Sequence, residues 1–360
     1  MKRIFNFGAG PAILPVSVLE RASCDVLELA DSGMSILETS HRGAEYEKIH
    51  FGAQTRLLKL MGLSAADYTV FFLGGGASQQ FAMLPMNFLA PGASADYVHT
   101  GEWAIRAIQE ARHYGDVNVA GSSEAGHFSF IPKELKRDPS ARYLHFTSNN
   151  TIEGTQWKNL PLALKGVPMI ADASSDFLSG SVDFGKFAML YAGAQKNLGP
   201  AGVTIVVMRK SFLATAREDI PNIFSYKTHA KADSLYNTPP VFSVYVIGLV
   251  LEWIENQGGL AGLGRRNQRK AEMIYSALDD CSDLYECACR ESGDRSLMNI
   301  TFRLRDSTRE TEFLAGAQAL GMEGLKGHRS VGGFRASVYN AFPEEGCVAL
   351  AGYLKSFARQ

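Results

Sequence analysis

Short apolar runs recur between residues 68 and 208 of the chain, and they constrain its fold more than any other feature. Most are apolar almost throughout, which is typical of strands buried on both faces of a mainly parallel sheet. Longer helical patterns separate the runs, and this alternation predicts an α/β fold. The predicted strands are 68–73, 96–99, 142–146, 168–171, 187–192 and 203–208. The predicted helices are 16–32, 46–61, 78–88 and 103–114.

The C-terminal part follows another pattern. A long helix is predicted from Pro240 to the Gly258-Gly259 break, and another starts near Leu263. Strands and helices then alternate at 298–304, 310–320, 334–339 and from Pro343. This order predicts a smaller α+β domain. We expect three parts: residues 1–15 packing with the small domain, a large domain at 16–259 and a small domain at 260–360.

Composition excludes several classes of protein. The net charge of −1 gives the chain no general attraction to nucleic acid or acidic membranes. Five cysteines without a C-x-x-C pair argue against a disulfide framework or a zinc site, so we expect no metal and a reducing compartment. The start, MKRIFNFGAGP, lacks the apolar core of a signal peptide, and the most apolar run, 241–253, is too short to span a membrane. We expect a cytoplasmic protein.

A glycine-rich turn, GGGAS at residues 74–78, follows a predicted strand and precedes a predicted helix. Backbone N–H groups in such a turn can bind a phosphate. The turn lacks the lysine of a P-loop, and Gln79 stands where a dinucleotide fingerprint has its third glycine. A flexible strand–helix connection explains the motif equally well.

Asp172 and Lys196 are candidate cofactor-binding residues that are more informative together than separately. Asp172 ends a predicted buried strand, where a carboxylate can pair with a pyridinium N–H. Taken alone, capping of a following helix is the stronger explanation. Lys196 lies among small residues after the next strand, as a Schiff-base lysine would, although an ion pair in a loop remains an alternative. A glycine-rich turn, a strand-end Asp and a Lys on the next loop form a more specific combination than any one of them.

Basic residues occur in loops at both ends of the chain. Paired His-Arg steps can bind carboxylate or phosphate, and arginine does so with bidentate geometry, although each is individually more often a surface charge. The pairs are His41-Arg42 and His328-Arg329, and Arg335 follows the second pair after two glycines. Trp103 could stack on a planar ring, but an aromatic residue at a helix start is more often a core anchor.

With these motifs in place, the sequence resembles the phosphoserine aminotransferase family of class-V, fold-type I pyridoxal-phosphate (PLP) enzymes. The resemblance runs nearly end to end, and its most specific segments are AGAQKNLGPAG at 192–202 and GHRSVGGFRAS at 327–337. Asn150-Thr151-Ile152-Glu153-Gly154 also matches. The resemblance implies a mainly parallel seven-stranded sheet in a large domain and a smaller α+β C-terminal domain.

The family also implies roles at matching positions. Lys196 would form the Schiff base with PLP and move the substrate α-proton, and Asp172 would pair with the ring nitrogen. The remaining cofactor-binding residues would be Gly76, Ala77, Trp103, Thr151 and Gln195, with Asn237 and Thr238 from a neighbouring subunit. Arg335 would bind the substrate α-carboxylate. The second anion would bind to His328 and Arg329 together with the neighbour's His41 and Arg42.

The resemblance therefore implies a homodimer with shared sites that transfers the amino group of glutamate to 3-phosphohydroxypyruvate. The products would be phosphoserine and 2-oxoglutarate, and 3-hydroxy-2-oxo-4-phosphooxybutanoate would be a further substrate. These reactions belong to serine and PLP biosynthesis. Two positions depart from some family members, which have Arg in place of Ala77 and Ser in place of Ala9. The lost arginine shifts phosphate recognition onto the His-Arg pairs.

Two alternatives stay open. A cysteine desulfurase of the same fold would need a reactive cysteine on a mobile loop, whereas Cys347 lies at the start of a predicted helix. A nucleotide-binding α/β protein without PLP would need the P-loop or fingerprint residues that the glycine-rich turn lacks.

Overall fold

Apolar runs form a central sheet of seven strands in the computed structural model, which describes residues 3–162 and 164–359. The spatial order is β2-β10-β9-β8-β5-β3-β4. The strands are β2 (Tyr68–Leu73), β3 (Ser94–His99), β4 (Asp116–Ser122), β5 (Leu144–Thr147), β8 (Met169–Asp172), β9 (Met189–Gly193) and β10 (Thr204–Arg209). β10 runs antiparallel to both its neighbours, and the other neighbouring strands pair in parallel. The predicted α/β fold with a mainly parallel seven-stranded sheet is confirmed.

Helices pack on both faces of this sheet, which explains why its strands are apolar throughout. Ile205 and Val207 of β10 belong to a core shared with α2 and α7, whereas Val206 and Met208 belong to a core shared with α3 and α4. Successive side chains of one strand thus enter two different cores. The helices are α1 (Val16–Leu27), α2 (Ala44–Met61), α3 (Gly76–Phe88), α4 (Glu102–Ala111), α5 (Lys210–Leu213), α6 (Tyr226–Lys231) and α7 (Val241–Asn256).

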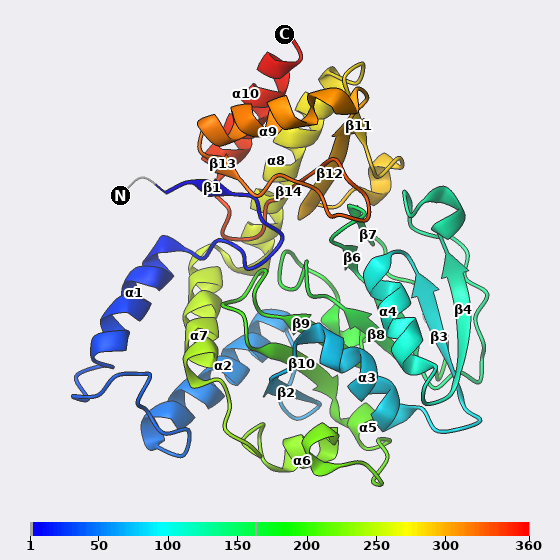
Figure 1. Ribbon diagram of the computed structural model, residues 1–360. Coiled ribbons are helices and arrows are strands. Elements are labelled where there is room, and N and C mark those ends of the chain that lie inside the picture. The colour runs from blue at the N-terminus through cyan, green and yellow to red at the C-terminus, as the bar shows by residue number, and fades with distance from the viewer. Residues whose placement is uncertain (1–2, 163, 360) are drawn as a thin grey trace.

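A smaller unit lies above the large sheet in Figure 1 and is built mainly from the C-terminal part. Its antiparallel sheet has the order β11-β12-β14 and a core of its own. The elements are α8 (Gly259–Asp280), β11 (Tyr285–Cys287), β12 (Asn299–Leu304), α9 (Glu310–Ala319), β13 (Met322–Glu323), β14 (Phe334–Ser337) and α10 (Glu344–Phe357). β1 (Phe5–Asn6) pairs in parallel with β13, and Phe7 enters this core. These contacts support the three-part division of the chain, which stays a proposal.

Some predicted boundaries are wrong. The helix predicted at 16–32 ends at Leu27, and Ala30 and Asp31 beyond it have positive φ angles of 48° and 58°. The helix predicted near Leu263 begins at Gly259, immediately after the glycine at which the preceding helix was expected to stop. β4 was not predicted, because this edge strand is mostly exposed or half-buried and lacks an apolar run.

Within residues 3–162 and 164–359, no helix combines the length and apolarity needed to cross a membrane.

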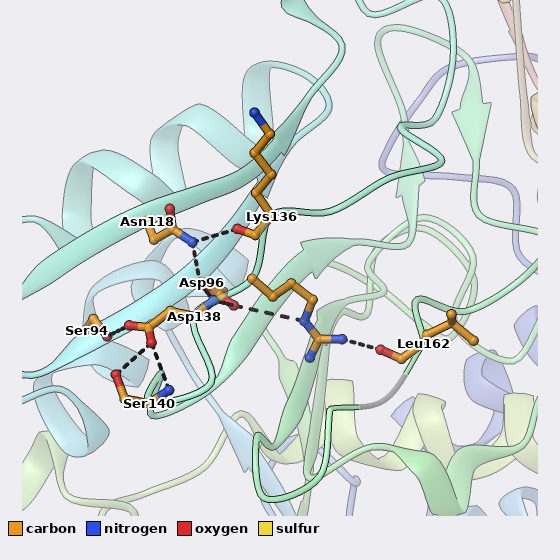
Figure 2. A network of polar contacts seen from close by, with 8 residues as sticks. Ser94, Asp96, Asn118, Lys136, Asp138, Ser140 and Leu162 are labelled. Carbon is orange, nitrogen blue, oxygen red and sulfur yellow. Dashed lines mark hydrogen bonds and ion pairs between the residues drawn. The ribbon is translucent and has the colours of Figure 1, made fainter.

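A buried carboxylate ties the loop after β4 to the edge of the sheet, as Figure 2 shows. Asp96 of β3 accepts hydrogen bonds from Asn118 Nδ2 at 2.7 Å and from the backbone N–H of Asp138 at 3.1 Å. Arg137 Nε lies 4.0 Å from Asp96 Oδ2. Burial raises the pKa of Asp96, and these donors oppose the shift. This network lies toward the amino end of β3, away from the strand ends that carry the predicted functional residues.

Candidate active site

The predicted functional motifs meet at one edge of the large sheet. β2, β3, β5, β8 and β9 run in the same direction, so their carboxyl ends lie along that edge. Open α/β sheets bind their ligands at this edge. Asp172 is the last residue of β8, and the segments that follow the other strands carry the GGGAS turn, Trp103, Thr151 and Lys196.

Lys196 lies in the loop between β9 and β10 and points toward two of the predicted residues. Its Nζ donates a hydrogen bond to Thr151 Oγ1 at 2.9 Å and lies 6.0 Å from the centroid of the Trp103 ring. No acidic group in the described chain pairs with it within 4.0 Å, so the alternative of a structural ion pair is wrong. Burial lowers the pKa of Lys196 to about 8, and the nearby Asp172 partly offsets this shift. A partly buried lysine with a lowered pKa is more readily deprotonated than an exposed lysine and can then act as a nucleophile.

Asp172 is the last residue of β8 and is only 4% exposed. Its Oδ1 accepts hydrogen bonds from the backbone N–H of Ser174 at 3.0 Å and from its hydroxyl at 2.6 Å. Among the described residues, none donates to Oδ2. Burial raises the pKa of Asp172, although Ser174 and Lys196 oppose the shift. Residues 174–178 form turns and not a helix, so the helix-cap explanation is wrong, and the free oxygen can accept a hydrogen bond from a cationic ring.

The GGGAS turn leaves the start of α3 free of side-chain caps. Gly75 adopts a left-handed conformation with a φ of 84°, and an added Cβ would lie 1.6 Å from Gln79 Oε1. Only glycine fits this position. The backbone N–H groups near Gly76 and Ala77 begin a helix of 13 residues, whose positive end favours an anion.

Gln195 lies next to Lys196 and joins the site to the N-terminal segment. Its backbone oxygen accepts a hydrogen bond from the N–H of Ala12 at 2.8 Å. The contact brings the N-terminal segment that contains Ala9 alongside the lysine loop.

Trp103 is the second residue of α4, and its buried Nε1 has no hydrogen-bond partner among the described residues. The start of α4 is held by Glu153, whose Oε1 accepts a hydrogen bond from the backbone N–H of Glu102 at 2.8 Å. The sequence interpretation missed Glu153. Its only signal was an acid two residues after Thr151 in a matched motif, and nothing in that motif shows that the side chain is buried.

Arg335 lies on β14 of the smaller unit and reaches the same edge. Its Nη1 donates to the backbone oxygen of Thr151 at 3.4 Å, and no acid in the described part of the chain lies within ion-pair distance. Burial lowers the pKa of Arg335. His328 and Arg329 lie in the loop before β14, and burial, followed by Arg335 and Arg329, lowers the pKa of His328. Arg329 and Arg335 bring positive charge to this part of the molecule, and that charge favours the neutral form of His328 and can attract an anion.

The remaining predicted residues are not brought to Lys196 within this chain. His41 and Arg42 lie in the turn before α2, and Asn237 and Thr238 lie in the exposed segment before α7. In the described part of the chain, none of the four exchanges a hydrogen bond with Lys196, Asp172 or Arg335. Their predicted role in a neighbouring site stays a prediction.

Comparisons with known proteins show the family to which the chain belongs. The profile of the family described as aminotransferase class-V matches residues 4–350. A phosphoserine aminotransferase of Niallia circulans is 50% identical over 360 residues, which cover 99% of each protein. The solved phosphoserine aminotransferase of Bacillus circulans subsp. alkalophilus has a TM-score of 0.96 at 50% identity and covers 100% of this chain and 99% of its own.

A PLP-bound phosphoserine aminotransferase of Trichomonas vaginalis has a TM-score of 0.91 at 33% identity, covering 98% of this chain and 100% of its own. The fold-type I architecture predicted from the sequence is therefore confirmed. The chain belongs to the class-V aminotransferase family, in its phosphoserine aminotransferase group.

Proposed function

We propose that this protein transfers the amino group of glutamate to 3-phosphohydroxypyruvate, forming phosphoserine and 2-oxoglutarate in serine biosynthesis. The observation that carries the proposal is the meeting of Lys196, Thr151 and Asp172 at one edge of the sheet, in a chain that shares 50% identity with phosphoserine aminotransferases over its length. The 3-hydroxy-2-oxo-4-phosphooxybutanoate of PLP biosynthesis is proposed as a further substrate, since it also joins a phosphate to a 2-oxo acid.

The cofactor is pyridoxal phosphate, and the residues present fit it. A buried carboxylate with a free Oδ2 suits a ring N–H, an easily deprotonated lysine suits an aldehyde, and the uncapped start of α3 suits a phosphate. When bound, the cofactor supplies a carbonyl carbon for amines and a ring that withdraws electrons from the substrate Cα.

We assign the chemistry to two side chains. Lys196 Nζ would hold the aldehyde carbon of the cofactor, and as a free amine it would move the proton of the substrate Cα. Asp172 Oδ2 would hold the ring N–H and stabilise its positive charge. Ser174 supports Asp172 through two hydrogen bonds to the other oxygen.

Other residues position the reactants. Thr151 accepts a hydrogen bond from Lys196. With the cofactor bound, Thr151 would contact the ring oxygen, Trp103 would stack on the ring, and Gln195 and the backbone near Gly76 and Ala77 would hold the phosphate. Arg335 binds the substrate α-carboxylate, because it is partly buried and has no acid partner among the described residues.

We further propose a homodimer with shared sites. His41, Arg42, Asn237 and Thr238 lie in exposed or half-buried segments, where a second subunit can receive them. A two-fold axis lets each subunit complete the other's site. The neighbour's His41 and Arg42, with His328 and Arg329, would then bind either the substrate phosphate or the distal carboxylate of glutamate.

The desulfurase alternative is not supported. Cys347 lies inside α10 and is fully buried, and burial raises the pKa of its thiol to about 12. A nucleophilic cysteine needs the opposite shift. All five cysteines are free thiols, which supports the proposal of a reducing compartment such as the cytoplasm.

A half-reaction tests the function directly. Phosphoserine is added to the purified holoenzyme without an acceptor, and the absorbance of the cofactor is followed as it changes to the amine form. Release of 3-phosphohydroxypyruvate in an amount equal to the converted cofactor is expected. An equal rate and extent with unphosphorylated serine would refute the proposed substrate.

A further inference from the structure

Glu153 is a buried acid near the site to which the proposed function gives no role. Its side chain is 6% exposed, and Oε1 accepts a hydrogen bond from the N–H of Glu102. Oε2 is buried without a hydrogen-bond partner among the described residues. A buried carboxylate oxygen without a donor is costly unless it serves a purpose or the group is protonated.

The position of this carboxylate is fixed by the turn that it contacts. A Cβ added to Gly101 would lie 2.4 Å from Glu153 Cδ and 2.5 Å and 2.6 Å from its two oxygens. The carboxylate thus occupies the space that a side chain at residue 101 would need. Glycine at 101 and an acid at 153 form a matched pair, and the carboxylate stays against the start of α4.

The charged groups around Glu153 come from two elements and one loop. Arg335 of β14 is the nearby cation that opposes the pKa shift of Glu153, and Glu102 of α4 is the nearby acid that favours it. Glu102 is itself paired with Arg106 at 2.7 Å. His328 lies in the loop before β14, and its pKa is also affected by Arg335, Glu102 and Arg106.

Arg335 and Glu153 face this region without touching. Arg335 Nε is buried and, like Glu153 Oε2, has no hydrogen-bond partner in the described residues. The two groups do not meet the 4.0 Å limit of an ion pair, yet each affects the pKa of the other. The arrangement leaves the guanidinium of Arg335 free for an external anion. It also keeps the Glu153 carboxylate close enough to offset the positive potential of Arg335.

We propose that Glu153 is a positioning residue that sets how strongly Arg335 binds a substrate carboxylate and makes this affinity fall as pH rises. The inference rests on the proposed function, because it takes Arg335 to be the carboxylate site. When Glu153 is neutral, the positive charge of Arg335 is uncompensated and attracts an anion fully. When Glu153 ionises, its negative charge offsets Arg335 and repels the same anion.

The direction in which anion affinity changes with pH follows from the linkage between anion binding and the protonation of Glu153. Burial raises the pKa of Glu153 to about 7, so the free enzyme changes its protonation near neutral pH. A carboxylate bound at Arg335 adds negative charge and raises this pKa further, so binding takes up a proton. A further rise of about one pKa unit would change the affinity about tenfold across the titration.

Binding of glutarate, an unreactive dicarboxylate, to the holoenzyme tests the proposal by calorimetry at about pH 6 and about pH 8.5. We expect the dissociation constant of the wild-type protein to rise about tenfold more over this range than that of Glu153→Gln. Glutamine keeps an acceptor for the Glu102 N–H but carries no charge, so α4 should start normally. Asp96→Asn is the matched control, since it neutralises a buried acid away from the site and should behave as wild type.

Arg335→Gln separates the possible failures. If this variant binds glutarate as wild type does, the proposed carboxylate site is wrong. If it binds weakly but Glu153→Gln retains the full wild-type pH slope, only the role of Glu153 is refuted. An effect of Glu153→Gln that persists unchanged in the Arg335→Gln background would also refute the coupling.

A second measurement tests the proposal if Glu153→Gln folds poorly. Enthalpies of glutarate binding in buffers of different ionisation enthalpy report the protons taken up by the wild-type protein. Uptake near pH 7.5 that disappears in Arg335→Gln is expected. Absence of uptake in the wild-type protein would overturn the proposal.

Discussion

Replacing Asp172 by Asn removes a negative charge that no neighbouring acid at the end of β8 can replace. Asp172 is 4% exposed, and no other acid ends β8, so its partner ring nitrogen would lose its only proposed counter-charge. Two unit charges about 4 Å apart at an effective dielectric constant of about 20 interact by about 4 kcal/mol. If that interaction stabilises the charge developing at the substrate Cα, its loss corresponds to a rate reduction of about a thousandfold.

The fold should tolerate this change. Asparagine keeps the Oδ1 acceptor for the N–H and hydroxyl of Ser174, and burial already disfavours the charge that is removed. We expect the free energy of unfolding of the cofactor-free protein to change by no more than about 1 kcal/mol. Urea denaturation measures this quantity separately from catalysis.

Single-turnover conversion with phosphoserine at saturating PLP is the assay, because it isolates the proton-transfer half-reaction from cofactor loss. Ser174→Ala serves as a graded control, since it keeps the carboxylate but removes its hydroxyl donor at 2.6 Å. A loss of about ten- to a hundredfold is expected for that variant. If Asp172→Asn lies within tenfold of wild type, about 1.4 kcal/mol, the assignment of Asp172 to the ring nitrogen is wrong.

Three further outcomes are expected. Lys196→Ala should lose steady-state turnover and yield no borohydride-reducible lysine–PLP adduct, and an adduct that persists would show that another lysine binds the cofactor. Arg42→Ala should reduce the efficiency of the half-reaction about ten- to a hundredfold more for phosphoserine than for serine, whereas equal losses would make Arg42 structural. Lys196→Ala and Arg42→Ala refolded together in equal amounts should form about half mixed dimers and restore roughly a quarter of wild-type sites. Mixed dimers without recovered activity would rule out the shared site.

The sheet could be predicted because of where its strands lie. β9 and β10 are covered on both faces, so nearly every residue is apolar and the runs stand out in the sequence. The edge strand β4 could not be found in this way, because water covers much of it and its residues are mixed. A prediction from apolar runs therefore detects the interior of a sheet better than its border.

The site was predictable only in part. Lys196 and Asp172 gave local signals, namely a lysine among small residues and an acid at a strand end. The hydrogen bond between Lys196 and Thr151 joins segments that lie far apart in the chain, and only resemblance indicated Thr151. Glu153 depends on the missing side chain of Gly101, and such a fit between distant positions leaves no pattern in either segment.

The pairing of β1 with β13 has a consequence for the order in which the molecule is assembled on the ribosome. Phe5–Asn6 is synthesised early, but its partner Met322–Glu323 emerges only after the strands of the large sheet. β1 therefore has no strand partner while β2 to β10 are synthesised and can fold. During that interval Phe7 has no core to enter, because the other buried residues of that core lie between 271 and 357, so the small unit can be completed only after the large sheet has been synthesised.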